Sequence, residues 1–278
     1  MLRIMFLIVI PILLLYYPII YYRYSNNYVE KFISKIKVPA INKKKYLFIG
    51  GLHRSGTSIL SQILGSSNKI SRHTYTDKYE DEGQHIQTVY ENGIEHGGVG
   101  KFCFDKNYHY TENSNLINEF NKSKLITQWE KFWNKNKYIY LEKSPVNLIH
   151  TRFLQKMFPN SYFIIIIRNP IVVSYATMKW KDQSLEQYLK HWILGYNIFK
   201  KDSKYLKNFI IIKYEDLCDN PYKEISKIEK MLNEQLNIDS NQLDRLKNSN
   251  YKYLKPISPD LIYKYEKDVS KFDYTLIT

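Results

Sequence analysis

Residues 46–58 read YLFIGGLHRSGTS. The first four of these residues are apolar strand formers, and after the loop apolar residues recur between positions 59 and 64 at the spacing of one helix face. A strand, a glycine-rich loop and a helix in this order surround an anion with backbone N–H groups and a helix N-terminus. This stretch therefore predicts an anion-binding loop of the P-loop type at the start of an α/β domain.

The loop lacks a residue that ATP- and GTP-dependent enzymes require. Gly51 and Gly56 have the P-loop spacing, but Thr57 occupies the position where those enzymes carry a Lys for the phosphates. In addition, the apolar run 163–167 ends in Arg168, whereas a kinase needs an Asp to hold magnesium. A nucleotide or metabolite kinase is therefore an alternative that the sequence disfavours.

The rest of the domain alternates between strand-like and helix-like segments. The apolar runs 138–141, 163–167 and 209–212 are predicted to be strands, the last of them buried. Ser184 begins a capping box for one helix, and apolar spacing between positions 225 and 232 indicates another. This alternation predicts an α/β fold, a P-loop-type parallel sheet flanked by helices on both sides.

The amino terminus is strongly apolar. Residues 4–22 form an uncharged stretch of 19 residues, which is long enough to span a bilayer. Tyrosines lie at its end and no small-residue cleavage site follows, which favours a retained signal-anchor over a cleaved signal peptide. We therefore predict a single-pass transmembrane helix over 1–23, a polar stem over 24–44 and the main domain over 45–278. A buried core helix is the alternative to the anchor.

The charge of the chain is positive and unevenly divided between its two cations. Lys and Arg total 41 against 27 Asp and Glu, a formal net charge of +14, and only 7 of these cations are Arg. The lysines are scattered, which indicates a solvated surface, so we expect no nucleic-acid partner. Because a guanidinium grips phosphate or sulfate with two hydrogen bonds, Arg54 and Arg168 are the informative cations. The 2 cysteines and 7 histidines show no metal-ligand spacing, so no metal is expected.

The loop resembles the donor-binding loop of sulfotransferases that use 3′-phosphoadenosine 5′-phosphosulfate (PAPS). Further blocks of the chain are similar to successive blocks of membrane-type and bacterial members of that family. They are DEGQH at 81–85, LEKSPVN at 141–147, FP at 158–159 with RNP at 168–170 after the next strand, KYEDL at 213–217 and FDY at 272–274. The resemblance covers residues 46–274, and the ordered set of blocks is more specific than the loop alone.

The resemblance implies which residues hold PAPS. The 5′-phosphosulfate would be held by Arg54, Ser55, Gly56, Thr57 and Ser58, and the 3′-phosphate by Arg168. In many relatives a Ser eight residues after this Arg shares the 3′-phosphate, but here that position is Ala176. We expect Ser174 or Thr177 to replace it.

The resemblance also implies the catalytic groups. Lys143 would meet the transferring group or the leaving oxygen. In tyrosylprotein sulfotransferases the base that takes the acceptor proton is a Glu after the loop helix, and in the acidic segment 80–82 we predict Glu82 for this role. His53, inside the loop, is a candidate donor to the bound sulfate.

Together these features predict a membrane-anchored sulfotransferase. It would transfer the sulfuryl group of PAPS by in-line displacement to a hydroxyl of a glycan, a protein tyrosine or a small metabolite. The glycine-rich turn 96–100, in a segment without clear periodicity, is expected to contact the acceptor. The resemblance implies a Golgi or secretory-pathway membrane, with the sidedness open because basic residues after the span favour a cytoplasmic domain. A non-catalytic, membrane-tethered anion-binding protein is the alternative from another class.

Overall fold

The computed structural model describes residues 44–181, 183–244 and 246–277. The predicted anchor over 1–23, and the stem apart from Lys44, lie outside these residues, so the membrane location stays a prediction. Within the described residues, no helix has the length and apolar character needed to cross a bilayer.

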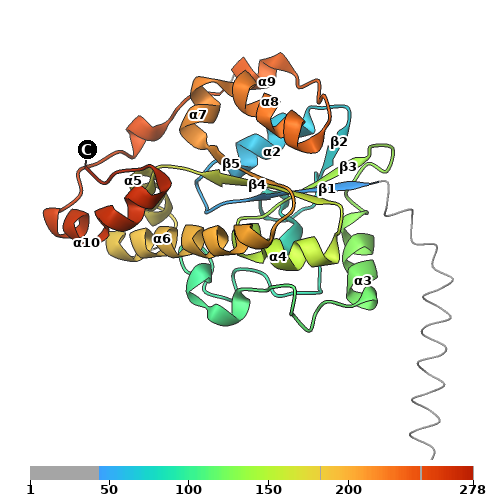
Figure 1. The fold of residues 1–278 in the computed structure, drawn as a ribbon, viewed down its shortest axis with the longest axis horizontal. Coiled ribbons are helices and arrows are strands. Elements are labelled where there is room, and N and C mark those ends of the chain that lie inside the picture. The colour runs from blue at the N-terminus through green and yellow to red at the C-terminus, as the bar shows by residue number, and fades with distance from the viewer. Residues whose placement is uncertain (1–43, 182, 245, 278) are drawn as a thin grey trace, which may run out of the picture. The chain divides into compact units, whose positions relative to one another are not determined.

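A five-stranded sheet forms the centre of the domain (Figure 1). Its strands are β1 (Lys45–Gly50), β2 (Ile70–Arg72), β3 (Ile139–Lys143), β4 (Ser161–Ile167) and β5 (Phe209–Lys213). They lie in the order β2-β3-β1-β4-β5, and every neighbouring pair is parallel. The predicted parallel α/β sheet is therefore confirmed.

Helices cover both faces of this sheet. They are α2 (Thr57–Gly65), α3 (Glu119–Trp129), α4 (Asn147–Met157), α5 (Pro170–Met178), α6 (Leu185–Asp202), α7 (Tyr214–Asp219), α8 (Pro221–Leu232), α9 (Ser240–Asp244) and α10 (Pro259–Val269). Figure 1 shows α2, α7 and α8 on one face and α4 and α6 on the other. The predicted arrangement, with helices on both sides, is confirmed.

Alternate residues of the central strands separate two apolar cores. Leu47 and Ile49 of β1 are fully buried in the core that contains α2 and α8. Phe48 points to the opposite face, where its ring stacks on Phe163 and contacts Trp129. Because side chains alternate between the faces of a strand, and both faces are covered here, the run 46–49 is apolar throughout.

The expectation of a buried strand over 209–212 is wrong. β5 is the edge of the sheet and pairs only with β4 among the described strands. Phe209 is 37% exposed and Ile211 49% exposed, whereas Ile212 is fully buried. A continuous apolar run indicated burial on both faces, but helices cover only one face of this strand.

Two glycines allow the turn from β1 into α2. Gly51 has φ +153°, and a Cβ there would lie 2.5 Å from the carbonyl oxygen of Ile166. Gly56 has φ +102°, and a Cβ there would lie 2.7 Å from the Tyr214 ring. The loop therefore packs against the end of β4 and the start of α7 more closely than any other residue type permits.

α6 supports the loop from the opposite side. The Tyr196 hydroxyl donates to the carbonyl of Ile166 at 2.9 Å and lies 3.2 Å from the Ser55 hydroxyl. Trp192 Nε1 donates to the carbonyl of Arg168 at 3.0 Å. One helix thus fixes both the loop and the end of β4, and its position decides the geometry of both.

Loss of the α6 cap tests this support. Ser184 and Gln187 form the predicted capping box, with the Ser184 hydroxyl accepting from Gln187 N–H. We expect Ser184→Ala to lower the free energy of unfolding by about 1 kcal/mol, because an N–H at the helix start loses its acceptor. Ser258→Ala is the matched control, since Ser258 precedes α10 without a side-chain cap. Urea unfolding measures both, and equal losses would contradict the role of the cap.

Candidate active site

A cleft of about 700 Å³ lies where the carboxyl ends of β1, β3 and β4 meet. The chain builds the sheet in one direction from β1 and then in the other, and ligands of open α/β sheets bind at such a reversal. The cleft is lined by His53, Arg54, Gly56, Thr57, Ser58, Ile59, Tyr79, Glu80, Glu82, Gln84, His85, Gly93, Ile94, Gly97, Gly98, Val99, Pro145, Val146, Arg168, Trp180, Lys181 and Tyr214. The predicted loop, base and second Arg are therefore brought together.

The loop presents cationic and N–H groups to the cleft. Arg54 lies with Cζ 4.8 Å from the centre of the Trp180 ring, and its buried Nε has no hydrogen-bond partner among the described residues. The N–H groups of Thr57 and Ser58 open α2 and have no intrahelical acceptor. Ser55 differs, because its hydroxyl contacts Tyr196 and its N–H donates to Leu52. Anion binding therefore falls to Arg54 and the first turn of α2.

Arg168 is held on every side. Its Nε donates to Asn250 Oδ1 at 2.8 Å, one terminal nitrogen to the carbonyl of Arg54 at 2.9 Å, and the other to Ser249 Oγ at 3.0 Å. The Tyr214 ring lies 3.9 Å from its Cζ. The predicted second anion-binding Arg thus lies in the cleft in a fixed orientation and joins the loop to the carboxyl-terminal part of the chain.

The blocks near the carboxyl terminus support this arrangement. Glu215 accepts from the Asn250 amide at 2.7 Å and from the Tyr274 hydroxyl at 2.7 Å. Asn250 in turn accepts from Arg168. Residues of the KYEDL and FDY blocks therefore act on the cleft through Asn250, a contact that the sequence did not indicate.

Glu82 and Lys143 form a buried ion pair. Lys143 Nζ lies 3.1 Å from Glu82 Oε1 and also donates to the carbonyl of Glu80 at 2.9 Å. Glu82 Oε2 accepts from the Gln84 amide at 2.6 Å. Burial raises the pKa of Glu82 above its usual range, while the Lys143 ammonium and the Gln84 amide act against this rise. Such a carboxylate is a better proton acceptor than a solvated one.

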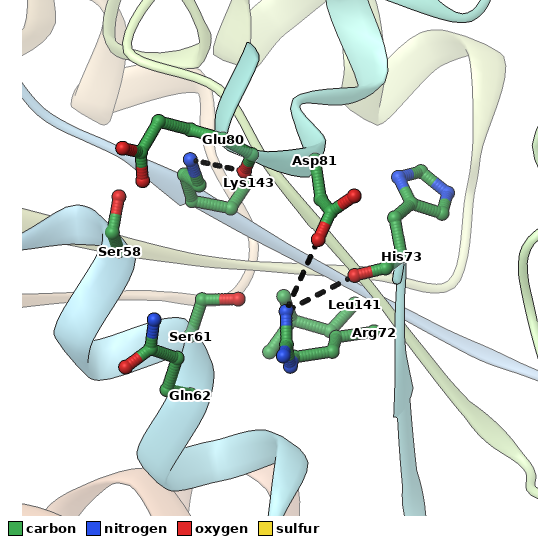
Figure 2. A pocket seen from close by; sticks show the side chains of 9 residues that line it. All are labelled: Ser58, Ser61, Gln62, Arg72, His73, Glu80, Asp81, Leu141 and Lys143. Carbon is green, nitrogen blue, oxygen red and sulfur yellow. Dashed lines mark hydrogen bonds and ion pairs between the residues drawn. The ribbon is translucent and has the colours of Figure 1, made fainter. Parts of the chain in front are cut away.

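Lys143 itself does not line the cleft. Figure 2 shows it in a small cavity of about 90 Å³, with its ammonium directed to the carbonyl of Glu80 beside residues of α2. Ser58 and Glu80 line both the small cavity and the cleft. The structure therefore gives Lys143 a direct contact with the predicted base, and its contact with a transferring group stays a prediction.

Glu142 fixes the segment that carries Glu82. It is fully buried and accepts from the N–H of Gly83 at 2.9 Å, the hydroxyl of Ser144 at 2.6 Å and the amide of Asn147. A Cβ on Gly83 would lie 2.4 Å from Glu142 Cγ, so only glycine permits this approach. Burial raises the pKa of Glu142 from 4.5 to about 7. The sequence analysis quoted this block but selected only Lys143.

The three remaining predicted residues differ in placement. His53 is half-buried in the cleft wall, and burial together with the Lys143 charge lowers its pKa to about 4, so its ring is neutral at pH 7. Ser174 is fully buried and its hydroxyl has no partner among the described residues, whereas the Thr177 hydroxyl donates to Val173 at 2.6 Å. Neither residue lines the cleft, so the partner of Arg168 stays open.

Trp180 and Tyr214 are functional candidates that the sequence analysis missed. Both place an aromatic ring against a guanidinium, Trp180 under Arg54 and Tyr214 under Arg168. The adjacency of Tyr214 to the strand end was visible in the KYEDL block, but no pattern marked Trp180. Within the described residues, no cluster of His, Cys, Asp and Glu has the arrangement of a metal site, and Cys103 and Cys218 are not bonded.

A family model with the description sulfotransferase family matches residues 47–237. The chain belongs to the sulfotransferase family. This match spans the loop, the Glu82 and Lys143 blocks and the strand end at Arg168, so it covers the cleft on both sides. No curated protein sequence matches this chain significantly.

Solved structures of sulfotransferases share the fold. The sulfotransferase domain from the curacin biosynthetic pathway is 16% identical with a TM-score of 0.52, covering 84% of this chain and 99% of that domain. Sulfotransferase STF1 from Mycobacterium tuberculosis is 13% identical (TM-score 0.48; 76% and 74% covered). Mouse SULT7A1, solved with PAP, is 13% identical (TM-score 0.46; 86% and 89% covered).

The raised pKa of Glu142 predicts a pH-dependent stability. The folded protein keeps a proton there up to about pH 7, whereas the unfolded chain loses it above pH 4.5. Relative to the Glu142→Gln variant, which has no ionisable group there, the wild type should lose up to about 1.4 kcal/mol for each pH unit as the pH rises between these values. Urea unfolding across this range measures the difference. The exposed Glu119→Gln is the control, and a constant Glu142→Gln difference would contradict the prediction.

Proposed function

We propose that this protein transfers the sulfuryl group of PAPS to an acceptor hydroxyl. One observation carries the proposal: a buried carboxylate, Glu82, lines the same cleft as a loop whose Arg54 and first-turn N–H groups are free to bind an anion. Membership of the sulfotransferase family supports sulfuryl transfer in general. The absence of a P-loop Lys, with Thr57 in its place, and the Arg at the end of β4 favour it over phosphoryl transfer to a metabolite.

The residues present fit PAPS. The buried Arg54 Nε and the His53 Nδ1 atom have no partner among the described residues, and both residues line the cleft. A volume of about 700 Å³ lies within the range of small-molecule sites. Arg54 with the first turn of α2 would hold the 5′-phosphosulfate, and Arg168, at the end of the neighbouring β4, the 3′-phosphate.

The order of the strands separates two sides of the cleft. β4, with Arg168, lies on one side of β1, and β3, with the Glu82–Lys143 pair at its end, lies on the other. With the 3′-phosphate toward β4, the sulfuryl end of the donor would face β3. The acceptor hydroxyl would then lie between the loop and Glu82.

The chain's residues would act together as follows. PAPS supplies the sulfuryl group and a phosphate leaving group. Arg54 and the N–H groups of α2 would offset the negative charge that grows at the loop during transfer. Glu82 would accept the proton of the acceptor hydroxyl, and its burial keeps water from competing. Lys143 would hold this carboxylate in place, which the observed contact favours over a role at the leaving oxygen.

Nucleotide binding tests the role of Arg168. We expect PAP to raise the melting temperature of the protein more than ADP does, because the 3′-phosphate adds a charge-assisted contact. Arg168→Lys should remove most of this difference and keep the ADP shift, since Lys cannot reproduce the fork of donors. Arg152→Lys is the matched control, because Arg152 is engaged by Glu112 and Asp202 outside the cleft. Equal shifts for PAP and ADP in the wild type would exclude the 3′-phosphate role.

The pH dependence of turnover tests the Glu82–Lys143 pair. Glu82→Gln should lower kcat by roughly 10² to 10⁴, the usual contribution of a general base. Lys143→Met removes a neighbouring positive charge, so the pKa of Glu82 rises and the increase of kcat/KM with pH moves to higher pH. The exposed Lys131→Met is the control. A Lys143→Met variant whose kcat falls equally at every pH would instead place Lys143 at the leaving oxygen.

A further inference from the structure

The side of the cleft toward β3 forms a wall of its own, here called the acceptor wall. It comprises Tyr79, Glu80, Glu82, Gln84, His85, Gly93, Ile94, Gly97, Gly98, Val99, Pro145 and Val146. The opposite side carries the loop, Arg168, Trp180, Lys181 and Tyr214. The glycine-rich turn, expected to meet the acceptor, therefore lies in the cleft beside the predicted base.

The charges of the acceptor wall are acidic. None of the described residues in it is Lys or Arg, and its charged members are Glu80 and Glu82. The nearest ammonium, that of Lys143, is already bound to both of these residues. The cleft's cations, Arg54, Arg168 and Lys181, lie on the donor side. An anionic acceptor would face two carboxylates without a cation to offset them.

The mouth of the acceptor wall is apolar. Ile94 is 61% exposed and Tyr79 75% exposed, although both line the cleft. Val146 and Pro145 continue this surface inward, and Gly97 and Gly98 add backbone without side chains. Exposed apolar side chains around a cleft mark a site that an apolar partner covers, with a gain of about 25 cal/mol for each Å² buried.

We propose that the acceptor is a small uncharged molecule that carries its hydroxyl on an apolar group. This inference rests on the proposed function and selects among the acceptors that the sequence left open. The apolar group would pack on Ile94, Val99 and Val146, and the hydroxyl would reach Glu82. In the reaction, the acceptor oxygen forms a bond to sulfur, the bond between sulfur and the phosphate oxygen breaks, and the acceptor proton passes to Glu82.

An acceptor panel tests the inference on the full chain. With radiolabelled PAPS, we expect 2-naphthol and 1-decanol to be sulfated, and desulfated chondroitin, an anionic glycan, and an acidic tyrosine peptide to be sulfated at least about 10-fold less efficiently in kcat/KM. Efficient transfer to the glycan or the peptide would overturn the inference. So would the absence of transfer to all four when PAP still stabilises the protein. Absence of PAP stabilisation would instead remove the proposed function.

Two matched variants localise the effect. Ile94→Lys puts a cation at the mouth of the acceptor wall and should raise KM for 2-naphthol about 10-fold, with kcat and the PAP-induced shift unchanged. Ile277→Lys is the control, because Ile277 is similarly exposed, at 64%, and does not line the cleft. Equal effects of the two variants, or none from Ile94→Lys, would place the acceptor elsewhere.

Discussion

The buried carboxylate of Glu142 sets the geometry of the base side of the cleft. Glu142 belongs to β3, so the sheet fixes its position, and its bond to the N–H of Gly83 draws the irregular segment after α2 across the end of that strand. Gln84 N–H donates to Ser144 Oγ in the same way. Glu82 therefore inherits the positional precision of a strand although it lies outside any regular element.

The donor side of the cleft depends on a comparable chain of contacts. Arg168 ends β4 and holds the carbonyl of Arg54, and its other donors engage Ser249 and Asn250. Glu215 then joins Asn250 to Tyr274 near the end of the described chain. Segments far apart in the sequence thus converge on one guanidinium, which couples the order of the carboxyl-terminal region to the shape of the anion-binding loop.

The sequence predicted those features that local pattern determines. The strand, loop and helix at 46–65, the parallel sheet and Arg168 at a strand end follow from apolar runs and glycine spacing. β2 has only three residues and shows no periodicity, and the exposure of Ile211 depends on its edge position. The roles of Glu142 and of the Ser55 hydroxyl depend on partners distant in sequence, which no local pattern contains.

The stacking of Arg54 on Trp180 also has a spectroscopic consequence. Trp129, Trp133 and Trp192 are buried, whereas Trp180 is 51% exposed and lies in the cleft wall. Its indole is therefore the tryptophan most sensitive to solvent, and the cation 4.8 Å from its ring is the group that the donor's anion would engage. Occupation of the loop changes both the charge and the hydration around one indole, so intrinsic fluorescence reports directly on that loop without an added label.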